Sequence, residues 1–183
     1  MPAETAYHDE VGDYFAKNAD TSPYNAYTDR PAMLSLAGAV GGLKILDVGC
    51  GAGHYAAELL AGGAEVVGID GSATLLKHAR ERLGDRAALR MHDAEQPLDF
   101  IDDASFDGVV CALMLHHIAD RPRLLGDLRR VLRPGGGCWP RRPTRRLTGG
   151  NSVARTTPKT GLTAHSPGGR WQSTTSACRW KRS

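Results

Sequence analysis

The stretch ILDVGCGAG at residues 45–53 decides the fold of this chain. A short apolar run ends in three alternate glycines, Gly49, Gly51 and Gly53, and the apolar residues that follow predict a helix ending at 62–63. Glycine tolerates the positive φ of a tight turn and lets the backbone approach a ligand closely. The stretch therefore predicts a buried strand, a glycine turn and a helix.

Strand and helix patterns continue to alternate after this stretch. Strands are predicted at 65–70, 88–91 and 106–113, and the last of these is apolar enough to be buried on both faces. Ser72 and Asp120 are good N-caps for the helices that follow them. Alternating strands and helices indicate right-handed βαβ units, so the predicted class is α/β, a Rossmann-like parallel sheet with helices on both faces.

Acidic side chains follow the second and third predicted strands, at the sheet edge where such folds bind ligands. Asp70 lies 21 residues after Gly49, where a carboxylate can accept hydrogen bonds from both hydroxyls of a ribose. Asp93 is placed to accept a hydrogen bond from the exocyclic amine of adenine, with a turn cap as the alternative. Together these residues predict an adenosine-containing ligand.

The glycine spacing narrows the choice of ligand. The nicotinamide-dinucleotide fingerprint would place its third glycine at position 54, which is His54 here. Asp47 stands two residues before Gly49, where its charge would repel a pyrophosphate but suits the ammonium of an amino acid. A ribose, an adenine and an amino-acid head describe S-adenosylmethionine, and a nicotinamide-dependent oxidoreductase is disfavoured.

Four segments carry a family resemblance. They are ILDVGCGAG (45–53), VVGIDGS (66–72), HDAEQPLDFIDDASFDGVV (92–110) and LRRVLRPGGG (128–137). In this order and spacing, residues 44–137 resemble a class I S-adenosylmethionine-dependent methyltransferase of the small bacterial type related to quinone-biosynthesis methyltransferases. The resemblance implies an enzyme that transfers a methyl group to a small-molecule acceptor.

The resemblance also implies which residues hold the cofactor. Asp47 and the backbone of the glycine turn would hold the methionine moiety, Asp70 the ribose, and Asp93 with Ala94 the adenine. The full set of expected cofactor-binding residues is Asp47, Gly49, Cys50, Gly51, Gly53, Asp70, Gly71, Ser72, Leu75, Asp93, Ala94 and Arg30.

The N-terminal residues 1–43 fit a helical lid over the cofactor, as in the family. Arg30 could pair with the methionine carboxylate in bidentate fashion. Tyr7, Tyr14 or Tyr24 would cover the site.

Two histidines, His116 and His117, follow the fourth predicted strand, where the methyl acceptor should approach. An imidazole titrates near neutral pH, so either could act as general base, and either could equally be a helix-start histidine without a chemical role. The sequence offers no third ligand, so a metal site is not expected. Positioning alone can contribute roughly 7–11 kcal/mol to an in-line methyl transfer.

Charge divides the chain near Gly137. Residues 1–137 have a net charge of −7, whereas residues 138–183 have a net charge of +10 and contain no Asp or Glu. Pro140 and Pro143 in an arginine-rich stretch argue against a central strand, so we expect a sheet truncated after its fourth strand and a disordered tail. Two origins of that tail stay open: a basic segment that binds nucleic acid electrostatically, or the product of a frameshift.

Other features exclude whole classes of protein. No apolar run reaches the roughly 18 residues of a membrane span, and the N-terminus lacks the apolar region of a secretory signal. The four cysteines form no C-x-x-C pair, so neither a disulfide framework nor a zinc site is indicated. We expect a cytoplasmic methyltransferase, with a non-catalytic S-adenosylmethionine-binding remnant, and less so a nucleic-acid-binding protein, as alternatives.

Overall fold

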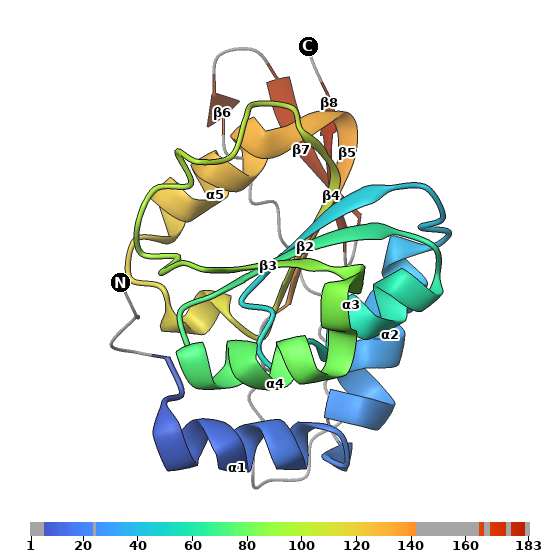
Figure 1. The fold of residues 1–183 in the computed structure, drawn as a ribbon. Coiled ribbons are helices and arrows are strands. Elements are labelled where there is room, and N and C mark those ends of the chain that lie inside the picture. Colours follow the sequence, from blue (N-terminus) through green and yellow to red (C-terminus); the bar gives the residue numbers. More distant parts are fainter. Residues whose placement is uncertain (1–5, 24, 142–164, 167–168, 175–176, 182–183) are drawn as a thin grey trace, which may run out of the picture.

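The computed structural model describes residues 6–23, 25–141, 165–166, 169–174 and 177–181. Its centre is a sheet of five parallel strands, shown in Figure 1. The strands are β1 (Lys44–Val48), β2 (Glu65–Asp70), β3 (Ala88–Met91), β4 (Phe106–Ala112) and β5 (Leu132–Arg141). They are hydrogen-bonded in the order β3-β2-β1-β4-β5, so β1 lies in the middle and the strand order reverses between β1 and β4.

Helices cover both faces of this sheet, as Figure 1 shows. They are α1 (Asp9–Ala19), α2 (Arg30–Ala37), α3 (His54–Ala61), α4 (Ala73–Leu83) and α5 (Arg121–Val131), with short turns η1 (Asn25–Asp29), η2 (Gly84–Arg86) and η3 (Leu115–His117). Leu124 and Leu128 of α5 pack in one core with Val109, whereas Met33 of α2 and Leu59 of α3 belong to a second core. The predicted α/β class is confirmed.

The predicted helix caps are present. Ser72 Oγ accepts a hydrogen bond from the backbone N–H of Leu75 at 3.1 Å, which satisfies a donor at the start of α4. Asp120 Oδ1 does the same for the N–H of Arg123 at 3.1 Å in α5. Both helices therefore begin where the sequence places them.

The expectation that the sheet ends at its fourth strand is wrong. Strand β5 pairs in parallel with β4, in a register that places Cys138 opposite Val109 and Trp139 opposite Val110. Both Cys138 and Trp139 are buried, so β5 runs through the charge boundary at Gly137 as part of the core. Pro140 lies beyond the two residues that pair with the next strand, in a stretch with one neighbour in the described sheet, where proline is tolerated.

Three short strands extend the sheet past β5. They are β6 (His165–Ser166), β7 (Gly169–Thr174) and β8 (Ala177–Lys181), all paired antiparallel, and β8 pairs with β5 at two positions. Residues 142–164, on which much of the expectation of a disordered tail rests, lie outside the described residues. None of the helices in the described part of the chain is long and apolar enough to cross a membrane.

Candidate functional site

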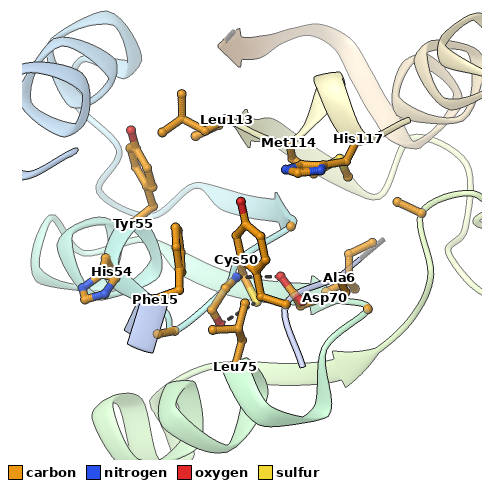
Figure 2. A pocket seen from close by; sticks show the side chains of 18 of the residues that line it. Ala6, Phe15, Cys50, His54, Tyr55, Asp70, Leu75, Leu113, Met114 and His117 are labelled. Atoms are coloured by element: carbon orange, nitrogen blue, oxygen red, sulfur yellow. Dashed lines mark hydrogen bonds between the residues drawn. The ribbon is translucent and has the colours of Figure 1, made fainter. Parts of the chain in front are cut away.

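A pocket opens at the carboxyl ends of the parallel strands, as Figure 2 shows. Its floor comes from the glycine turn after β1, from Asp70 at the end of β2, from 92–94 after β3 and from 112–114 at the end of β4. Residues of the N-terminal segment complete the wall. The predicted sites on four separate strands therefore converge on one pocket.

The glycine turn brings bare backbone to the pocket. Gly49, Gly51 and Gly53 all have positive φ, at 72°, 54° and 79°. A Cβ on Gly49 would lie 2.5 Å from Cγ of Met114, closer than packed atoms allow. The backbone N–H of Gly49 donates to the carbonyl of Ile69 at 2.8 Å, which fixes the turn against the end of β2. The turn therefore requires glycine for both its conformation and its packing.

Asp70 is held rigidly at the edge of the pocket. Its Oδ2 accepts a hydrogen bond from the backbone N–H of Gly51, and its Oδ1 accepts one from the N–H of Ser72, each at 2.8 Å (Figure 2 draws the side chain). Burial raises the pKa of this carboxyl, while the two hydrogen bonds act in the opposite direction. Each oxygen keeps acceptor capacity for a ligand, since an ionised carboxylate offers about four lone-pair sites.

Asp47 does not line the pocket. Its side chain is 1% exposed, and its Oδ2 has no hydrogen-bond partner among the residues the structure describes. Burial, assisted by the neighbouring charge of Asp70, raises the pKa of Asp47 to about 7. Asp47, which the sequence predicted to bind the ammonium group of the cofactor, is therefore buried before the glycine turn and does not reach the surface of the cavity.

The loop after β3 contributes Asp93 and Ala94 to the pocket. Asp93 Oδ1 also accepts a hydrogen bond from the N–H of Glu95 at 2.9 Å, so the turn-capping interpretation describes part of its role. The carbonyl of Ala94 accepts a hydrogen bond from the guanidinium of Arg123 on α5. That contact fixes the loop beside the cavity.

The N-terminal segment lies over the pocket. The rings of Tyr7 and Phe15 pack 4.8 Å apart, and both residues line the cavity. The hydroxyl of Ser72 donates to the carbonyl of Tyr7, so Ser72 is fully buried between α4 and the N-terminal segment and does not line the pocket. Tyr14 is 71% exposed and does not line the pocket, and Tyr24 lies outside the described residues.

Polar contacts connect α1, which lies over the pocket, to α4. His78 Nε2 lies 2.6 Å from Asp13 Oδ1, and that contact lowers the pKa of Asp13. Arg82 donates to Asp20 Oδ2 at 2.9 Å. Figure 1 shows α1 running alongside α4, and these pairs join α4 to α1 at Asp13 and to Asp20 directly after α1.

The two candidate histidines differ in position. His117 lines the pocket, and its ring meets the ring of Tyr7 edge-on at 5.8 Å. His116 does not line the pocket, although its ring lies 3.9 Å from that of His117. Of the two, the geometry therefore brings His117 to the cavity.

The sequence analysis did not predict Tyr55 and Asn25, two polar residues that line the pocket. Tyr55 lines the cavity, and its hydroxyl donates to Asp29, which is fully buried at the end of η1. Asn25 lines the same pocket, as does Arg30, which the sequence predicted. The one available signal was that Tyr55 stands two residues after the last glycine of the turn, on the first turn of α3.

His54, the residue in place of the third dinucleotide glycine, also lines the pocket. Its Nδ1 lies 2.8 Å from Asp20 Oδ1, without the angle of a hydrogen bond. Burial lowers the pKa of His54 to about 4, so the ring is neutral at pH 7. The remaining expected residues divide by position: Cys50, Gly71 and Leu75 line the pocket, whereas Gly53 does not.

Comparisons with known sequences agree with this geometry. The model of a family described as "Methyltransferase domain" matches residues 46–139. A demethylmenaquinone methyltransferase of Clavibacter sepedonicus is 37% identical over 134 residues, which are 72% of this chain and 54% of that protein. A ubiquinone biosynthesis O-methyltransferase of Alkalilimnicola ehrlichii is 38% identical over 102 residues, 54% of this chain and 41% of that protein. The chain thus spans about half the length, or less, of these curated relatives.

Solved structures that resemble this chain are also methyltransferases. An S-adenosylmethionine-dependent methyltransferase from Mesorhizobium loti superimposes with a TM-score of 0.56 at 31% identity, covering 66% of this chain and 53% of that one. Phosphoethanolamine N-methyltransferase 2 of Haemonchus contortus, in complex with S-adenosyl-L-methionine, gives a TM-score of 0.56 at 26% identity. The match covers 68% of this chain and 34% of that one.

Proposed function

This chain belongs to the family of class I S-adenosylmethionine-dependent methyltransferases, and we propose that it methylates a small-molecule acceptor with S-adenosylmethionine as its cofactor. One observation carries the proposal. The carboxylate of Asp70 is fixed by two backbone N–H groups at the pocket edge, directly beside the bare backbone of the glycine turn. A rigid double acceptor beside exposed backbone suits the two hydroxyls of a ribose.

The remaining lining residues fit the rest of this cofactor. Asp93 and Ala94 would meet the adenine, and the side chain of Leu75, which also lines the pocket, would supply an apolar contact on the adenine side. The backbone at Gly49 and Gly51 would approach the methionine moiety, since no side chain intervenes there. The cofactor supplies a methyl group already activated by a sulfonium, so the protein's task is to hold and orient the two reactants.

The wall that remains is apolar. Ala112, Leu113 and Met114 at the end of β4 face the pocket, together with Phe15 from α1. A wall of this kind excludes water from the reacting atoms and favours an acceptor with an apolar body. Within the described residues, His117 is the imidazole on the β4 side of the pocket, and it would remove a proton from an acceptor that arrives protonated.

Calorimetric titration of S-adenosylmethionine into the full chain tests cofactor binding. The variant Asp70→Ala removes the ribose acceptor, and we expect its affinity to fall at least about tenfold, because a hydrogen bond to a charged group contributes roughly 1.5–3 kcal/mol. Asp85→Ala is the matched control, since Asp85 is an exposed carboxylate away from the pocket. Equal affinities of the Asp70→Ala variant and the unmodified chain would contradict the proposal.

Transfer of a labelled methyl group to a panel of small apolar acceptors tests catalysis separately. Transfer supports the proposed enzyme. Saturable cofactor binding with no transfer to any acceptor would favour the alternative, a protein that binds the cofactor without turnover.

A further inference from the structure

The pocket has two polar ends, and the proposed function uses one of them. Figure 2 shows Asp70 and Ala6 on one side of the pocket and Tyr55 and Leu113 on the other. With the adenosine at Asp70, as proposed above, the amino-acid head of the cofactor would reach the other side of the pocket. Asp47, the expected partner of its ammonium, does not reach the cavity.

Tyr55 offers the cavity a hydrogen-bond acceptor and no donor. A tyrosine hydroxyl carries one proton, and Tyr55 donates that proton to the carboxylate of Asp29. Burial, followed by this contact with Asp29, raises the pKa of Tyr55, so the hydroxyl stays protonated at neutral pH. The oxygen can therefore accept a hydrogen bond from a ligand, and it is polarised by the buried carboxylate behind it.

Arg30, which also lines the pocket, offers hydrogen-bond donors instead of an acceptor. It directly follows Asp29 at the start of α2, and a guanidinium is a donor without acceptor capacity. One of its amino groups donates to the carbonyl of Ala19 at 3.2 Å, while its Nε has no hydrogen-bond partner among the described residues. Both Asp29 and Arg30 are positioned by η1, a π-helical turn, and such turns are frequent at functional sites.

We propose that Tyr55, backed by Asp29, binds the α-ammonium group of the cofactor, beside an α-carboxylate that faces Arg30. An ammonium is a donor only and a carboxylate an acceptor only, so these two lining side chains match an amino-acid zwitterion in polarity. This assignment rests on the proposed function. It makes Tyr55 a residue that distinguishes the whole cofactor from adenosine compounds without an amino group.

The test compares two ligands by calorimetry on the full chain. One is S-adenosylhomocysteine, and the other is 5′-S-(3-carboxypropyl)-5′-thioadenosine, which has the same skeleton and carboxylate but lacks the amino group. We expect the unmodified chain to bind the second ligand about tenfold more weakly. Tyr55→Phe should bind S-adenosylhomocysteine about tenfold more weakly and the amino-free ligand unchanged. Tyr14→Phe, which alters an exposed tyrosine outside the pocket, should behave like the unmodified chain.

Two results would overturn the assignment. Equal affinity of the unmodified chain for both ligands would do so without any variant, even if Tyr55→Phe failed to fold. An equal loss for both ligands in Tyr55→Phe would show a structural role instead. A third ligand, 5′-methylthioadenosine, separates failure of the proposed function from failure of the Tyr55 assignment. If neither it nor S-adenosylhomocysteine binds, both proposals are wrong. If all three ligands bind with equal affinity, only the assignment of Tyr55 is wrong.

Discussion

The carboxyl group of Asp47 keeps its proton to a higher pH in the folded protein than in the unfolded chain. It is almost completely buried behind the glycine turn, near the second carboxylate at Asp70, and its pKa rises to about 7. An aspartate in an unfolded chain titrates near 3.9. Between these two values the folded protein holds a proton that the unfolded chain releases, so this residue links stability to pH.

The sign of that linkage gives a first prediction. Because the folded pKa is raised, the stabilising contribution of the protonated group is present below about pH 4 and is lost as pH rises through about 7. Asp47→Asn removes this titration, so between pH 5 and pH 8 the unmodified chain should lose on the order of 2 kcal/mol more stability than the variant. Urea unfolding at both pH values measures the difference. Asp85→Asn, at an exposed site, is the control. If the free energy of unfolding of the Asp47→Asn variant changed with pH as it does in the unmodified chain, the prediction would be wrong.

Single residues also decide how much of the site could be predicted. Asp70, Gly49 and Gly51 line the pocket as predicted, because the prediction depends on spacing along the chain and spacing is visible in a sequence. The contact of Tyr55 with Asp29 joins α3 to η1 across the folded molecule, and no local pattern marks it. For the same reason Asp47 was placed on the cavity surface, since sequence position does not show on which side of the turn a side chain points.

Among the elements, α1 has a role that its sequence pattern does not reveal. It covers the pocket with Phe15 while its polar contacts run along α4. These contacts are ion pairs on partly exposed side chains, so they contribute little to global stability. We therefore expect α1 to move away from the pocket more readily than the elements of the core, since the ion pairs that connect it to α4 are weak.

That balance predicts a kinetic effect at the level of the helix. His78→Ala removes the partner of Asp13, and we expect S-adenosylhomocysteine to dissociate about three times faster, with little change in the thermal midpoint, as suits a surface ion pair. Stopped-flow displacement measures the rate. Arg80→Ala, an exposed change on the same helix, should leave it unaltered. An unchanged dissociation rate in His78→Ala would mean that α1 does not control exit.

The elements differ in how far the sequence predicted them. Strands β2 and β3 have their predicted bounds, β1 lies in the predicted apolar run before the glycines, and β4 ends one residue early, because apolar runs and flanking glycines are local signals. Strand β5 was missed because prolines and arginines dominate its C-terminal neighbourhood. Its burial depends instead on Trp139, which packs where Gly108 on β4 has no side chain: a Cβ there would lie 2.5 Å from the indole. Such complementarity between distant residues is a tertiary property.

For the whole molecule, this packing decides whether the residues just past Gly137 belong to the domain. Trp139 is 7% exposed and shares a core with Met33 and Ile45. Trp139→Ala should reduce the free energy of unfolding by about 3–5 kcal/mol, the usual cost of emptying a buried tryptophan site. Urea unfolding measures it, with Tyr27→Ala as the exposed aromatic control. Full retention of stability would show that the segment after 137 is peripheral.

The Gly108–Trp139 contact also bears on the order in which the molecule is made. A chain grows from its N-terminus, and the core that contains Met33 and Ile45 stays incomplete until Trp139 has left the ribosome. Until then β4 has no neighbour on its outer side and presents an unpaired apolar edge to other nascent chains. The loops that line the pocket are therefore synthesised before Trp139, and we expect the chain to be most prone to aggregation during this interval.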